Sequence, residues 1–142
     1  MKPFKQLSFH DNKILMTFPV YIALLAANAD GIIDEEEKLV AYEFAHIKTF
    51  SGDPLLKSFY KETEIAFKSS LLQLNKQLPI EKASREIAIK EKLLIIEKIV
   101  MKLDEQSVKV LHQNMNALAK HVSKAHNNAL VNFIFPIPGL IV

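Results

Sequence analysis

One stretch of the sequence combines residue types and spacing that could bind a metal ion: NADGIIDEEE, at positions 28–37. A calcium loop of the EF-hand type has oxygen ligands at alternate positions, a glycine at the sixth position and a glutamate at the twelfth. If Gly31 takes the sixth position, four oxygen-bearing residues fall at the third, fifth, ninth and twelfth positions. These residues are Asn28, Asp30, Asp34 and Glu37. The pattern therefore indicates a divalent-cation site, for calcium or magnesium, at this turn.

The same residues also suit a turn that binds no metal. The first position of the loop would be Ala26, which has no side-chain oxygen, so tight calcium binding is not expected. Asp30 and Gly31 are typical of a turn with a positive φ at the glycine. Asp34, with Glu37 three residues later, forms a capping box at the start of a helix. A weakly bound divalent cation and a purely structural turn therefore both stay open, and no cofactor is certain.

Glu43 and His46 form the other pair that could do chemistry, a Glu-x-x-His motif. Carboxylate-bridged di-metal bundles need two such motifs and two further glutamates from other helices, and the sequence holds no second copy. The five histidines, His112 among them, form no i, i+4 pair, and we expect them to be exposed or partly buried. The G-x-S-x-G, P-loop, dinucleotide-binding and H-E-x-x-H motifs are also missing from the sequence. We therefore expect a protein that is not an enzyme, and the role of Glu43 and His46 stays open.

Composition and charge exclude several other classes of function. The 142-residue chain has no cysteine, which excludes disulfides, thiolate zinc sites and a cysteine nucleophile. Its formal net charge is only +2, and among its 18 basic residues Arg85 is the single arginine. Because the arginine fork is favoured for binding phosphate and guanine, we do not expect a nucleic-acid partner.

Two apolar runs, at 14–27 and 129–142, are the candidates for a membrane segment. Both are shorter than the roughly 20 apolar residues that a spanning helix needs, and both contain proline. The first residues, 1–13, are too polar for a signal peptide. We therefore expect no membrane span and a cytoplasmic location.

Apolar periodicity and helix-capping residues predict a succession of helices and no strands. The first helix covers about 11–28, with Pro19 marking either a kink or a start near Phe18. Later helices are predicted at 34–49, from Pro54 to about Asn75, at 80–103, and from Asp104 or Ser107 to about Asn128. Because the first helix and the segment 93–101 are apolar on several sides, both are expected to be surrounded by other helices. The predicted fold is an all-α, single-domain bundle of about five to seven helices over residues 1–142.

Three features concern the arrangement of these helices. The segment 80–103 is either one helix or two helices that meet near Lys90. The segment LLAANADGIIDEEEKLV is echoed by IVMKLDEQSVKVL, which aligns Asp34 with Asp104. Two pseudo-repeated helical hairpins would produce that echo, and so would chance. The tail 133–142 is apolar and interrupted by proline, so we expect it to lie in a groove of this domain or of a neighbouring chain.

The segment ALLAANADGIIDEEEKLVAYEFA, at 23–45, resembles the TerB-like family. That family comprises helical domains of tellurite-resistance operons and of a membrane-anchored DnaJ-type co-chaperone. In the family an apolar helix ends in Ala-Asp-Gly, a short apolar link follows, and Ser or Asp begins the next helix with Glu three residues later. The matching residues here are Ala29, Asp30, Gly31, Asp34 and Glu37. Asp104 matches the family's second acidic turn, whose glycine is absent from this chain.

The resemblance implies a compact all-α domain with two pseudo-repeated halves and a divalent-cation surface at the acidic turns. It also implies an adaptor role in a membrane-associated stress-response complex. We therefore expect a non-enzymatic, TerB-like helical interaction module with a protein partner and a weak cation site at 28–37. The alternative is a helical scaffold or oligomerisation domain. In that case the tail 133–142 docks on a partner or on a second copy of the chain, and the acidic turn is purely structural.

Overall fold

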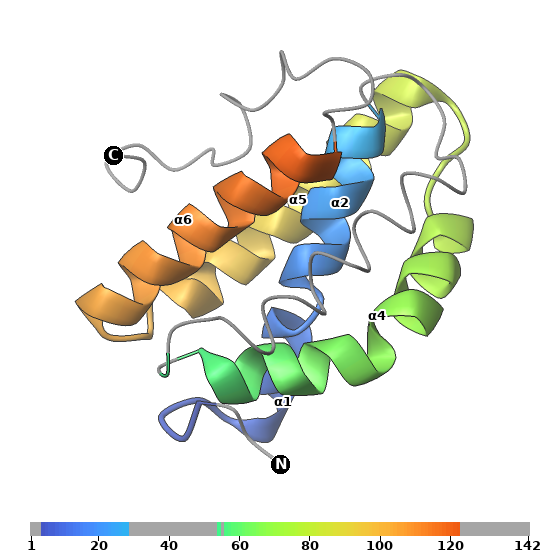
Figure 1. Cartoon of the computed structure of the whole chain (residues 1–142). Coiled ribbons are helices and arrows are strands. Elements are labelled where there is room, and N and C mark those ends of the chain that lie inside the picture. Colours follow the sequence, from blue (N-terminus) through green and yellow to red (C-terminus); the bar gives the residue numbers. More distant parts are fainter. Residues whose placement is uncertain (1–3, 29–53, 55, 123–142) are drawn as a thin grey trace.

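The protein is an all-α bundle, as the sequence predicts. The computed structural model describes residues 4–28, 54 and 56–122, and no strand occurs among these residues. In chain order the helices are α1 (Phe9–Leu15), α2 (Phe18–Asn28), α4 (Lys57–Gln77), α5 (Lys82–Val100) and α6 (Glu105–Val122) (Figure 1). The predicted helix 34–49, which holds Glu43 and His46, and the tail 133–142 lie outside the described residues.

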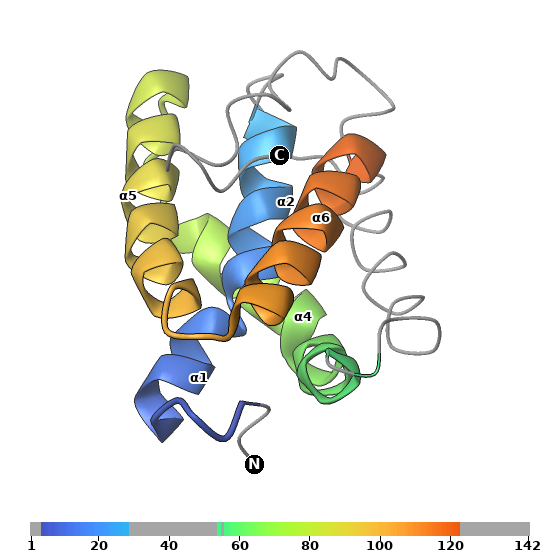
Figure 2. The ribbon, with the colours of Figure 1, turned by 90° about the vertical axis from the view of Figure 1, so that its left-hand side faces the viewer.

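Helix α2 is the centre of the bundle. All eleven of its residues are buried, and none of them carries a charge. It lies between α5 and α6 and also contacts α4 (Figure 2). A helix that is apolar on every side is stable in water only when other elements cover every side. The prediction that this segment lies deep in the bundle is confirmed.

Pro19 marks the start of a helix and not a kink. α1 ends at Leu15, and α2 begins at Phe18, so that the proline falls in the first turn. The N–H groups of that turn have no partner within a helix, so the missing N–H of proline costs nothing there. The Thr17 hydroxyl donates to the Ile14 carbonyl at 2.6 Å and stabilises the break between the two helices. No described helix is long and apolar enough to cross a membrane.

Two buried polar side chains hold segments that would otherwise be loose. Asn12 accepts a hydrogen bond from the Phe4 N–H at 3.0 Å and donates to the Phe4 carbonyl at 2.9 Å, which ties the N-terminal segment to α1. Arg85 of α5 donates to the side chain of Asn75 and, at 3.2 Å, to the Pro79 carbonyl. The guanidinium therefore closes the turn between α4 and α5 by several donors at once.

Helix α5 is a single continuous helix, so of the two alternatives for this segment the single helix is right. The prediction that its second half is surrounded is wrong. Leu94 is 44% exposed and Ile95 is 47% exposed, whereas Leu93 and Ile96 are buried. α5 thus packs one side against the core and presents further apolar residues on its other side.

Two carboxylates stabilise the pair of helices α5 and α6, one in the turn between them and one inside the core. Asp104 caps α6, because its side chain accepts from the Ser107 N–H at 3.1 Å and from the Ser107 hydroxyl at 2.7 Å. These hydrogen bonds hold the pKa of Asp104 below its usual range. Of the two caps that the sequence allowed, Asp104 is therefore the right one.

The second carboxylate, Glu97, lies inside the core with His112 of α6. The Nε2 atom of His112 is 2.8 and 2.9 Å from the two oxygens of Glu97, and both side chains are almost fully buried. These distances are those of a hydrogen bond between the imidazole and the carboxylate. The expectation that His112 would be exposed or partly buried is wrong, because an imidazole paired with a carboxylate can be enclosed.

We predict that Glu97→Ala lowers the free energy of unfolding by about 3–5 kcal/mol, because it removes the buried carboxylate that pairs with His112. Glu86→Ala on the same helix is the control. Glu86 is partly exposed and pairs with Lys90 at 3.3 Å, so its loss is expected to cost less than about 1 kcal/mol. Urea unfolding followed by circular dichroism measures both changes. Equal midpoints for the two variants would contradict this role of Glu97.

Candidate functional site

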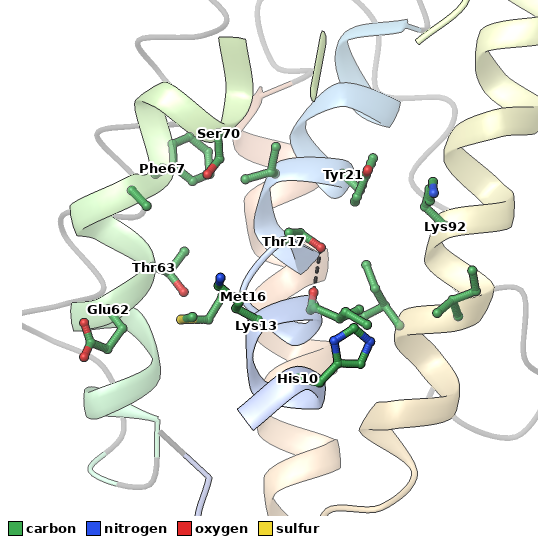
Figure 3. A pocket seen from close by; sticks show the side chains of 15 residues that line it. His10, Lys13, Met16, Thr17, Tyr21, Glu62, Thr63, Phe67, Ser70 and Lys92 are labelled. Carbon is green, nitrogen blue, oxygen red and sulfur yellow. Dashed lines mark hydrogen bonds between the residues drawn. The ribbon is translucent and has the colours of Figure 1, made fainter. Parts of the chain in front are cut away.

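A pocket of about 500 Å³ lies between α1, α2, α4 and α5 (Figure 3). Each helix contributes residues at helical spacing, so one face of each helix lines the pocket. α1 and the turn after it supply His10, Lys13, Ile14 and Met16, and α2 with the residue before it supplies Thr17, Val20 and Tyr21. α4 supplies Glu62, Thr63, Ala66, Phe67 and Ser70, and α5 supplies Lys92, Ile95 and Ile96.

The interior of the pocket is mostly apolar. Val20, Phe67 and Ile96 are buried and form its deep surface, and the half-exposed Ile95 lies at its edge. A cavity with such a lining favours the apolar part of a ligand, because water gains little from occupying it.

Thr63 is the polar group whose surroundings are unusual. It is only 3% exposed, and its hydroxyl oxygen has no hydrogen-bond partner among the residues that the structure describes. Figure 3 shows its side chain projecting from α4 towards α2. A buried hydroxyl without a partner costs about 1–3 kcal/mol. Because the oxygen itself is covered, a molecule in the pocket would gain this hydrogen bond only when the Thr63 side chain turns towards it.

The charged side chains that line the pocket are mostly basic. Lys13 and Lys92 are exposed at its rim, and Glu62 is the one acidic residue in the lining. Lys13 places its ammonium 5.7 Å from the centre of the Phe9 ring. Lys92 forms no ion pair with any residue in the described part of the chain. The balance of charge at the rim therefore favours an anionic group.

Tyr21 adds a hydrogen-bonding group on the α5 side of the pocket. The residue is buried, and burial raises the pKa of its phenol above the usual 10.0. The phenol is therefore neutral at physiological pH and can donate as well as accept. In Figure 3, Tyr21 and Lys92 lie on one side of the pocket, and Thr63, Phe67 and Ser70 lie on the other. The two sides offer different partners to one ligand.

Of the predicted metal ligands, Asp30, Asp34 and Glu37 lie outside the described residues, and only Asn28 is described. Asn28 ends α2 and is buried, and its amide nitrogen donates to the Lys82 carbonyl at 3.2 Å. Its Oδ1 atom is buried and accepts no hydrogen bond from the described part of the chain. Within the described ranges no group of three or more histidines or carboxylates could hold a metal ion.

Comparisons of the chain with models of protein families, with curated proteins and with solved structures found no match. The sequence analysis singled out none of the residues of this pocket as functional. Its polar residues come from positions 10 to 92, and none of them belongs to a local motif. Only the packing of four helices brings them together.

We predict different effects on stability for two Thr→Val substitutions, each of which keeps the shape of the side chain and removes its hydroxyl. Thr63→Val removes a buried hydroxyl that has no partner, so the free energy of unfolding should stay unchanged or rise by about 1 kcal/mol. Thr17→Val removes the hydrogen bond from the Thr17 hydroxyl to the Ile14 carbonyl and should lower the free energy of unfolding by about 0.5–1.5 kcal/mol. Thermal and urea unfolding of both variants make the comparison. A Thr63→Val variant less stable than Thr17→Val would show that the Thr63 hydroxyl already has a partner.

Proposed function

We propose that the protein is a non-enzymatic helical binding module, and that its pocket binds a small amphipathic molecule with an apolar body and one anionic group. The observation that carries this proposal is the pocket of about 500 Å³ with its apolar deep surface and basic rim, beside a buried Thr63 hydroxyl that has no hydrogen-bond partner among the described residues. Polar atoms in such a position are usually paired. A bound molecule would supply the missing partner.

The apolar body of the ligand follows from the deep surface of the pocket. Val20, Phe67 and Ile96 offer no hydrogen bonds, and the volume of about 500 Å³ falls in the range typical of small-molecule sites. Burial of an alkyl chain there is favourable by about 0.8 kcal/mol for each CH₂ group. A chain of several such groups is enough for measurable affinity.

The anionic group follows from the α5 side of the pocket. Lys92 offers an ammonium without an ion-pair partner in the described part, and the neutral phenol of Tyr21 lies on the same side. A carboxylate accepts hydrogen bonds from both kinds of donor. Because Lys92 is exposed, this contact is expected to orient the ligand more than to bind it tightly.

The proposal is tested with three ten-carbon probes that differ only in their head group: decanoate, decanol and decylamine. Binding is followed by NMR of labelled protein below the concentrations at which the probes form micelles. We expect decanoate to bind most tightly and to shift the signals of Thr63, Tyr21 and Phe67. Lys92→Gln should weaken the binding of decanoate by at most about fivefold, or about 1 kcal/mol, and leave the binding of decanol unchanged.

Two controls make this test specific. Lys109→Gln removes the same charge from α6, which does not line the pocket, and should leave all three affinities unchanged. Ala66→Trp fills the pocket from α4 and should abolish binding. Equal binding of decanoate and decylamine would refute the anionic group, and the absence of saturable shifts with any probe would refute the pocket as a binding site.

A second proposal concerns the acidic turn and the resemblance to TerB-like domains. Asn28 leads into this turn with a buried Oδ1 atom that accepts no hydrogen bond, and an amide oxygen is a suitable ligand for calcium or magnesium. Together with Asp30, Asp34 and Glu37 it would bind the ion weakly, in an adaptor that meets a protein partner in a stress response. Location in the cytoplasm belongs to this proposal.

We predict that calcium or magnesium shifts the backbone amide signals of residues 28–37 in a saturable way. The double variant Asp30→Asn, Asp34→Asn should abolish the shifts, because it removes two of the carboxylates. Signals that stay unchanged at millimolar concentrations of both ions would leave the turn as a capped helix start without a cation.

A further inference from the structure

Helix α5 carries an exposed apolar row that the core does not use. Ile87, Leu94 and Met101 follow one another at intervals of seven residues, and they are 61%, 44% and 52% exposed. Seven residues make almost two turns of a helix, so each step of seven residues moves the side chain by only about 20° around the helix axis. The row is about 21 Å long at 1.5 Å for each residue. It is long enough to contact another helix over several turns.

Two charged residues flank the centre of this row. Glu91 lies about one turn before Leu94 and Lys98 about one turn after it, and both are exposed. At 100° for each residue they lie on the same side of the row. Neither forms an ion pair with another residue of the described segments. The row is therefore bordered by one negative and one positive charge at similar distances from its midpoint.

This arrangement is complementary to itself. If a second α5 lies antiparallel, with the twofold axis passing at Leu94, Ile87 of one copy faces Met101 of the other. The same rotation places Glu91 of each copy opposite Lys98 of the other copy, so the interface contains two such pairs. A parallel pair would instead place the two copies of Glu91 on opposite sides of the row, and likewise the two copies of Lys98, so that Glu91 would not meet Lys98. Twofold contacts between identical surfaces are the commonest form of protein association.

From this pattern we infer that a second copy of the chain docks on the outer face of α5, in an antiparallel helix pair centred on Leu94. The contact is small, so the dimer is a weak one that forms reversibly. It is independent of the pocket proposed above, because Ile87, Glu91, Leu94, Lys98 and Met101 do not line the pocket.

The first test measures molar mass against concentration by sedimentation equilibrium, from about 10 μM to about 1 mM, a range suited to small interfaces. We expect the mass to rise towards that of a dimer. Leu94→Glu should keep the protein monomeric throughout. Ile65→Glu is the matched control, since it changes an exposed isoleucine of α4 and should leave the dimer intact. Circular dichroism confirms that both variants are folded.

The second test reverses the charges. Glu91→Lys alone and Lys98→Glu alone should each weaken the dimer, because each opposes like charges across the interface. The double variant, Glu91→Lys with Lys98→Glu, should restore it, because every pair regains opposite signs. Restoration is not expected from a partner of different sequence, so this result distinguishes a second copy from another protein.

The third test uses the absence of cysteine from the chain. Under oxidising conditions Leu94→Cys should form a disulfide-linked dimer, because this residue meets its own copy near the axis. Ile87→Cys alone should not, but a mixture of Ile87→Cys and Met101→Cys should cross-link. A mass that stays monomeric at all concentrations, a dimer that persists in Leu94→Glu, or self-linking of Ile87→Cys would overturn the inference.

Discussion

The rest of the structure depends on the burial of α2 on all of its sides. Its residues from Phe18 to Asn28 carry no charge, so every face of this helix must be covered by another element. Helices α4, α5 and α6 supply that cover in the described part of the chain. The pocket lies where α4 and α5 flank the side of α2 that carries Tyr21 (Figure 3). The candidate binding site is thus a product of the same constraint that forms the core.

Apolar burial requires α2 to be covered but does not determine which helix lies where. That choice is restricted by the few buried polar groups, each of which needs a particular partner. Glu97 and His112 fix the register of α5 against α6, and Arg85 fixes the start of α5 against the end of α4. Such contacts have a geometry that apolar contacts lack, and so they favour one arrangement of helices over others.

The sequence predicted local features well. Pro19 and Asp104 each marked one of two alternatives for the starts of α2 and α6, because proline and capping residues act on the few residues beside them. It was wrong about the surroundings of α5, because a helix with apolar residues on two sides has the same pattern whether its second side is enclosed or exposed. The pocket and the Glu97–His112 pair were missed, since both depend on contacts between separate helices. The acidic turn at Asp30, Asp34 and Glu37 lies outside the described residues.

The central position of α2 also has a consequence for the order of folding. The contacts that orient the helices are close in sequence: Asn12 to Phe4 spans eight residues, Arg85 to Asn75 spans ten, and Glu97 to His112 spans fifteen. Contacts of this kind close short loops and form early. The enclosure of α2 by α5 and α6 joins segments much farther apart in the chain. We therefore expect the enclosure of α2 by α5 and α6 to follow these local contacts, and until it is complete the apolar surface of α2 would favour aggregation of newly made chains.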